Sequence, residues 1–102
     1  MNDEGEIIRH ISVQGRVQGV GFRAFVEHHA LRRGLSGWIR NRSDGSVEAV
    51  FAGDEKSVIG MIEACRTGPL GARVDALYER EGTADELKLS RPGELFSALP
   101  TM

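Results

Sequence analysis

Several features that would narrow the function of a small protein are scarce or missing in this sequence. Cys65 is the only cysteine, which excludes an intramolecular disulfide and a zinc site built from cysteine pairs. No apolar run approaches the length of a transmembrane helix. The acidic N-terminus contains no apolar export segment, so we expect a cytoplasmic protein that does not bind membranes. The formal net charge of −2 argues against a sequence-independent nucleic-acid binder, which is usually basic.

The composition is that of an ordinary globular domain. Of the 102 residues, 40% are apolar and 27% are charged, with both signs interspersed. This length supports one hydrophobic core, but not two lobes with a cleft between them. We therefore expect residues 1–102 to form a single domain and a monomer, with residues 1–6 as a frayed tail.

The spacing of apolar residues predicts a regular succession of strands and helices. Alternating runs predict strands over residues 7–14, 35–42, 46–52 and 72–81, and stripes with helical spacing predict helices over residues 22–33 and 55–67. Asp54 is the expected N-cap of the second helix, and Asp44-Gly45 indicates a hairpin between the second and third strands. We expect a loop over residues 82–94 and a short last strand within residues 94–99.

This order predicts an α+β fold. The succession βαββαβ is that of the ferredoxin-like split βαβ sandwich, an antiparallel sheet with two helices on one face. In the strand over residues 72–81, simple alternation places Val74, Ala76 and Tyr78 on the face opposite Leu77. Because many unrelated functions use this fold, the function has to come from a site.

The glycine-rich stretch over residues 15–23, Gly-Arg-Val-Gln-Gly-Val-Gly-Phe-Arg, is the strongest candidate site. It follows a predicted strand and opens a predicted helix, so its N–H groups and the helix N-terminus can converge on an anion. Arg23 lies in the first helical turn, where a cation opposes the helix dipole and a bound anion would offset the mismatch. Its guanidinium can also bind two phosphate oxygens at once.

The same glycines fit other interpretations. A glycine-rich connector with a surface arginine needs no ligand. The segment Gly19-Val20-Gly21-Phe22-Arg23-Ala24 also fits the dinucleotide-binding pattern, with Asp44 about 20 residues on. However, Asp44 lies in a predicted tight hairpin, and the chain is too short for a second mononucleotide-binding half. A P-loop is excluded because no Gly-Lys-Ser/Thr follows the glycines.

Several sequence blocks together resemble the acylphosphatase family. In chain order they are residues 15–23, Gly34-Leu35, Gly37-Trp38-Ile39-Arg40-Asn41, residues 44–48, Gly53, Gly68-Pro69, Ala72 and Val74. They extend over roughly residues 8–80, and the first block combined with Gly-Trp-x-x-Asn is highly specific. Arg42 departs from the pattern, which often has a threonine or a small residue there, and the C-terminal part from Gly82 follows it poorly.

The resemblance implies hydrolysis of the carboxyl–phosphate bond of small acylphosphates to a carboxylate and inorganic phosphate, with no metal and no organic cofactor. It implies that the backbone of Gln18, Gly19, Val20, Gly21 and Phe22 and the side chain of Arg23 bind the phosphate. It also implies that Asn41 positions the attacking water. Elementary chemistry agrees, because phosphoryl transfer depends on positioning and charge stabilisation, and a carboxylate leaves without much help from an acid.

Two other classes of function remained open. A non-catalytic module that binds an anion or a partner has the same glycine loop, although the chain has no room for a further domain that it would serve. An RNA-binding sheet shares the topology, but it exposes aromatic residues on its central strands. The first predicted strand here has none, and the third has only Phe51, whose alternation with Val47 and Ala49 indicates a core position. His29, Cys65 and Trp38 are expected to be packed side chains, and His28 and His29 point too far apart to share a metal.

Overall fold

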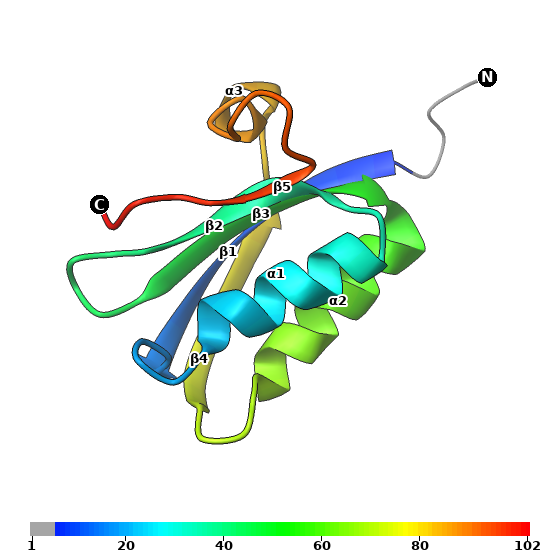
Figure 1. Cartoon of the computed structure of the whole chain (residues 1–102). Coiled ribbons are helices and arrows are strands. Elements are labelled where there is room, and N and C mark those ends of the chain that lie inside the picture. The colour runs from blue at the N-terminus through cyan, green and yellow to red at the C-terminus, as the bar shows by residue number, and fades with distance from the viewer. Residues whose placement is uncertain (1–5) are drawn as a thin grey trace.

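The computed structural model describes residues 6–102, which form a five-stranded sheet in the order β4-β1-β3-β2-β5 with two longer helices on one face (Figure 1). The elements are β1 (Glu6–Arg16), α1 (Phe22–Arg32), β2 (Ser36–Asn41), β3 (Val47–Asp54), α2 (Glu55–Thr67), β4 (Arg73–Glu81), α3 (Ala84–Leu87) and β5 (Phe96–Ala98). The α+β ferredoxin-like arrangement is confirmed. Of the expected tail, residues 1–5 lie outside the described residues, and Glu6 already opens β1.

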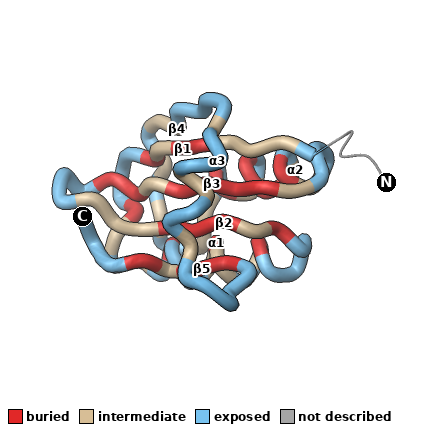
Figure 2. The backbone as a smooth tube through the Cα atoms, turned by 90° about the horizontal axis from the view of Figure 1, so that it is seen from above, coloured by how far each residue is buried: buried red, intermediate tan, exposed pale blue. Residues whose placement is uncertain are grey.

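The main core lies between the sheet and the two helices. The inward residues of β1, Ile11 and Val13, lie beside those of the central strand β3, which is mostly buried, whereas β1 is buried only in its middle (Figure 2). Helix α1 buries Phe22, Val26 and Ala30, and α2 buries Val58, Met61, Ile62 and Cys65. Burying a large apolar side chain contributes roughly 1.5–3 kcal/mol, so these two stripes attach the helices to the sheet.

Local signals set the boundaries of α2. The Asp54 carboxylate accepts a hydrogen bond from the Ser57 N–H at 3.1 Å, which makes Asp54 the N-cap that its side chain predicts. At the other end, Gly68 has a φ of 71°, a left-handed value that favours glycine and ends the helix. No helix among residues 6–102 is long and apolar enough to cross a membrane.

The expectation of an antiparallel sheet is wrong at one edge. Strand β5 pairs with β2 in parallel, with Trp38 opposite Ser97 and Ile39 opposite Ala98, so the sheet is mixed. The reason is topological. After β4 the chain crosses to the far edge of the sheet and arrives there running in the direction of β2 (Figure 1).

Residues 82–94 contain the short helix α3, where a loop was predicted. Thr83 and Glu86 form a reciprocal capping box, which is the Thr-x-x-Glu signal present in the sequence. Helix α3 lies on the face opposite α1 and α2, which we call the open face. There the Glu86 carbonyl accepts a 2.7 Å hydrogen bond from Trp38 Nε1, so a second small core of Trp38, Val50 and Leu99 is covered.

The alternation expected for β4 is also wrong. The register of β1 with β4 shifts between Gln14 and Gly15, so that Asp75 has no partner on β1. This bulge lets Val74 and Leu77 both contact the main core, whereas Tyr78 is exposed. An extra residue in one strand reverses the alternation on either side of it, and nothing in the sequence of β4 alone indicates where it falls.

Candidate active site

The loop between β1 and α1 has the backbone shape of an anion site. Gly19 and Gly21 have φ values of 73° and 81°, in the left-handed region that glycine adopts without a steric penalty. Gly21 is the N-cap of α1 and offers no side chain to cap the first N–H groups. A Cβ at either glycine would meet no atom within 4 Å, so both positions face open space and the conformation alone requires glycine.

Gly15, the first glycine of the motif, serves a different purpose. It lies within β1, and a Cβ there would collide with the main chain of Arg73 on β4. Gly15 therefore allows two strands to approach closely at the bulge, whereas Gly19 and Gly21 shape the loop. The glycine-rich appearance of the motif thus has two separate physical causes.

This loop contains hydrogen-bond donors that have no acceptor among the described residues. Among the hydrogen bonds of residues 6–102, none has a main-chain N–H of residues 18–22 as its donor. The first N–H groups of a helix carry its positive partial charge, which favours an anion in front of them. The exposed guanidinium of Arg23 likewise has no ion-pair partner in the described part of the chain. Several donors and one cation are thus free to bind the same oxyanion.

Asn41 lies at the end of β2 and borders the same space. Its Oδ1 is buried and is the one buried side-chain polar atom within residues 6–102 that lacks a hydrogen-bond partner. A pocket of about 200 Å³ is lined by Val17, Gln18, Gly19, Gly21, Phe22, Arg23, Ala24 and Asn41. Two segments that are distant in the sequence therefore meet at one pocket, which brings Arg23 and Asn41 together. An unsatisfied buried oxygen needs an explanation, and a water molecule in the pocket would supply one.

Val20 differs from its neighbours in the loop. Its side chain packs against the main core and does not line the pocket. This apolar contact anchors the middle of the loop between its two left-handed glycines. A larger hollow of about 590 Å³ is lined in part by Gly34, Gly53 and Gly82, but within residues 6–102 no buried side-chain polar atom without a hydrogen-bond partner borders it.

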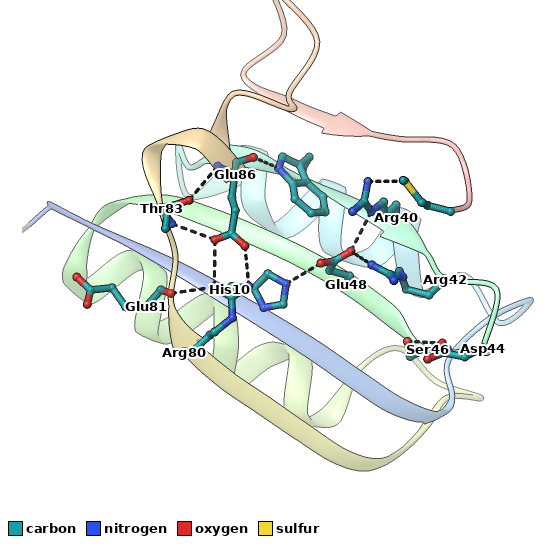
Figure 3. A network of polar contacts seen from close by, with 12 residues as sticks. His10, Arg40, Arg42, Asp44, Ser46, Glu48, Arg80, Glu81, Thr83 and Glu86 are labelled. Atoms are coloured by element: carbon teal, nitrogen blue, oxygen red, sulfur yellow. Dashed lines mark hydrogen bonds and ion pairs between the residues drawn. The ribbon is translucent and has the colours of Figure 1, made fainter.

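Arg42, where the sequence departs from the family pattern, belongs to a polar cluster on the open face (Figure 3). This Glu48 cluster consists of His10, Arg40, Arg42 and Glu48. Glu48 accepts hydrogen bonds from Arg42 Nη1 at 2.8 Å and Arg40 Nε at 2.9 Å, and its second oxygen lies 2.7 Å from His10 Nε2. Burial opposes ionisation of Glu48, but these three contacts outweigh it and lower the pKa to about 2. The Arg42 side chain therefore bonds to Glu48 and does not line the pocket.

The remaining candidates from the sequence are structural. Cys65 is buried, and burial raises the pKa of its thiol to about 12, so it is not a nucleophile. His29 is half-buried against Phe25, with ring centroids 4.4 Å apart, and burial together with the nearby His28 lowers its pKa. No group of three or more metal-ligating side chains occurs in the part of the chain that the structure describes.

Sequence reasoning missed one contact at this site. The side chain of Gln18 donates hydrogen bonds to the main-chain oxygens of Arg42 and Ser46, on the hairpin between β2 and β3. Both partners are main-chain atoms more than 20 residues away, so no residue type marks the contact in the sequence. The family pattern draws attention to Gln18 only for its backbone.

These features define a class of protein: a small split βαβ domain whose first loop and second strand form a pocket lined by an arginine and by main-chain N–H groups without hydrogen-bond partners among residues 6–102. The acylphosphatase family model matches residues 9–89. A curated acylphosphatase of Rhodopseudomonas palustris (strain BisB18) is 58% identical over 94% of this chain and 97% of its own length. Among solved structures, the acylphosphatase of Bacillus subtilis has a TM-score of 0.78 and 37% identity over 91% of this chain and 98% of its own. That of Coxiella burnetii has a TM-score of 0.81 and 31% identity, covering 94% and 95%.

The chain belongs to the acylphosphatase family. The matched region includes the whole loop from Gly15 to Arg23 and the strand that ends at Asn41. The resemblance inferred from the sequence blocks is therefore confirmed, and the fold class with it.

Proposed function

We propose that this acylphosphatase hydrolyses small acylphosphates at the pocket between the β1–α1 loop and the end of β2. Membership of the family makes the protein a hydrolase that acts on acylphosphates. The observation that carries the assignment of the site is the buried, unpartnered Oδ1 of Asn41 beside a loop of free N–H donors. One half of the pocket is suited to an anion and the other to a water molecule.

The loop half binds the phosphoryl group. Main-chain N–H groups of Gln18, Gly19, Val20, Gly21 and Phe22 donate to its oxygens, and the N-terminus of α1 adds positive potential. Arg23 contributes a guanidinium that can contact two oxygens at once. Charge is spread over the equatorial oxygens in the transition state, so preorganised donors around them lower the barrier.

The Asn41 half supplies the nucleophile. Its Oδ1 accepts a hydrogen bond from a water molecule and so aims a water lone pair at phosphorus. The new bond joins the water oxygen to phosphorus, and the bond from phosphorus to the carboxyl oxygen breaks with its electron pair on the carboxylate. An amide is a poor base, so the water proton passes to an oxygen of the substrate phosphate. The products are a carboxylate and inorganic phosphate.

The remaining expectations extend this proposal. We infer that the chain acts as one domain and as a monomer in the cytoplasm, with an acylphosphate as substrate and no nucleic acid as partner. The formal net charge of −2 supports the absence of a nucleic-acid partner, because domains that bind nucleic acids are usually basic.

A direct assay tests the function. Purified protein in buffer with EDTA should release phosphate from acetyl phosphate and from benzoyl phosphate, and added inorganic phosphate should inhibit competitively. Binding of phosphate without turnover of either substrate would instead favour the non-catalytic anion-binding module. Absence of both binding and turnover would contradict the proposal.

A further inference from the structure

The side chain of Gln18 connects the phosphate loop to a different part of the molecule. Its Nε2 lies 2.8 Å from the main-chain oxygen of Arg42 and 2.9 Å from that of Ser46. Carbonyl oxygens only accept hydrogen bonds, so the amide must turn its NH₂ group toward them, and both hydrogens are used. The orientation of this half-buried side chain is therefore defined by its partners.

Both acceptors belong to the base of the hairpin that follows Asn41. Arg42 directly follows Asn41 in the chain, and its N–H donates to the Ser46 oxygen at 2.8 Å, which closes the hairpin. The Asp44 carboxylate accepts from the N–H and the hydroxyl group of Ser46, so the turn is also held from within (Figure 3). The hairpin base is thus a well-ordered frame, and Gln18 is attached to it at two points.

The position of this frame sets the position of Asn41 relative to the loop. Within the described residues, Gln18 is the one residue of the loop over residues 17–21 whose side chain forms hydrogen bonds to the hairpin over residues 41–47. If these two contacts are lost, the phosphate half and the water half of the pocket can shift against each other. A misplacement of about 1 Å can reduce the rate of an oriented reaction about 100-fold.

We propose that the Gln18 side chain is a positioning residue that holds Asn41 at the distance from the phosphate loop that water attack requires. This inference rests on the proposed function and assigns the side chain a role separate from that of the Gln18 main-chain N–H. Gln18 does not touch the water in this account; it acts through Asn41.

The structure also shows why Gln18 can be replaced without unfolding the protein. The Arg42 oxygen keeps a second donor, the Gly45 N–H at 3.1 Å, and the Ser46 oxygen keeps the Arg42 N–H. Neither carbonyl is left without a hydrogen bond when the glutamine amide is removed. Methionine has nearly the length and shape of glutamine but no donor, so Gln18→Met isolates the two hydrogen bonds.

The first experiment compares kcat, KM and the inhibition constant of inorganic phosphate. In Gln18→Met we expect kcat to fall at least about tenfold, while KM and the phosphate inhibition constant stay within about twofold of the unaltered protein. Ser90→Ala is the matched control. It removes a 3.0 Å hydrogen bond from the Ser90 side chain to the main-chain oxygen of Gly37, which lies on β2 at the end opposite Asn41. This variant should keep kcat within about twofold of the unaltered protein.

The second experiment asks whether Gln18 acts through Asn41. In an Asn41→Ala background, Gln18→Met should change kcat by less than about twofold, because the group that it positions is gone. A merely structural role would give the same loss in both backgrounds and would overturn the inference, as would an unchanged kcat in Gln18→Met alone. If the unaltered protein has no acylphosphate turnover, the proposed function fails and the inference fails with it.

Discussion

Two polar regions of this molecule contain arginines, but the arginines are paired with a carboxylate in one region and unpaired in the other. In the Glu48 cluster on the open face, Arg40 and Arg42 both bond to one carboxylate that is only 14% exposed. At the pocket, Arg23 has no ion-pair partner within residues 6–102, and the Asn41 Oδ1 is buried without any hydrogen bond. The charged groups of the Glu48 cluster are thus partners of one another, whereas Arg23 and the Asn41 Oδ1 at the pocket have no protein partner within the described residues.

The contrast separates groups that stabilise the fold from groups kept for a ligand. Buried polar groups without partners cost about 1–3 kcal/mol, so they persist where another requirement maintains them. The two regions are neighbours, since Arg42 of the Glu48 cluster directly follows Asn41 of the pocket. Removing the unpaired side chain of Arg23 or Asn41 should therefore lower activity without lowering stability, whereas removing the Glu48 carboxylate should lower stability and leave activity unchanged.

The largest expected effect is that of Arg23→Ala on turnover. Removing an arginine that stabilises the transition state of phosphoryl transfer costs on the order of 10³-fold or more in kcat/KM, and inhibition by phosphate should weaken as well. Stability should stay the same or rise by a few tenths of a kcal/mol, because a cation in the first turn opposes the helix dipole. Steady-state kinetics and urea unfolding measure the two effects.

The control for Arg23→Ala is Arg32→Ala, which removes the same charge from the opposite end of α1. Its turnover should remain within about twofold. If the two substitutions lowered kcat/KM equally, general electrostatic attraction would explain the effect, and the assignment of Arg23 to the phosphate would be wrong.

A smaller effect is expected from a change in the shape of the loop. Gly21→Ala places a side chain at a φ of 81°, which costs about 1 kcal/mol of stability and tilts the neighbouring N–H groups. We expect kcat/KM to fall at least about tenfold, because the donors no longer converge. Gly93→Ala is a close match, with a φ of 85° and no atom within 4 Å of its Cβ. It should lose similar stability and keep full activity; a comparable loss of activity in Gly93→Ala would show that instability alone is responsible.

The smallest expected effect on turnover is that of Glu48→Gln, which tests the other side of the comparison. Its kcat should stay within about twofold, but the free energy of unfolding at pH 7 should fall by about 2 kcal/mol, because two arginines lose a buried partner. Glu63→Gln is the control, since its exposed ion pair with Arg66 should contribute less than about 0.5 kcal/mol.

The same substitution changes how stability depends on pH. The pKa of Glu48 is about 2 in the folded protein and 4.5 in its ordinary state, so its contribution is complete above pH 4.5 and is lost as the pH falls toward 2. Urea unfolding between pH 6 and pH 2 should show a smaller acid loss in Glu48→Gln than in the unaltered protein. Equal acid losses would contradict the lowered pKa.

Most of the fold could be predicted because its signals are local. The stripe of α2, the N-cap Asp54 and the Asp44-Gly45 hairpin each depend on residues close together in the sequence, and the structure confirms them. The parallel pairing of β5 and the bulge in β4 could not be predicted in this way. Both depend on which distant strand lies alongside, which local patterns do not specify.

The candidate site also combines features that could be predicted from neighbouring residues with features that could not. The glycines and Arg23 of the loop predict an anion site from neighbouring residues alone, whereas Asn41 was singled out by the family resemblance. The burial of the Asn41 Oδ1 and the bridge from Gln18 to the hairpin are long-range features of packing. Both features depend on how the loop packs against the hairpin, which no pattern of neighbouring residues specifies.

Asn41→Ala provides the most direct test of the central claim, that the pocket joins a phosphate half to a separate water half. The measurement combines kcat, the dissociation constant of inorganic phosphate and the free energy of unfolding for this one variant. We predict that kcat falls about 100-fold, that phosphate binds within about twofold of the unaltered protein, and that stability is unchanged or higher, because an unsatisfied buried oxygen is removed. An undiminished kcat, or a loss of phosphate binding in proportion to the loss of turnover, would contradict the account.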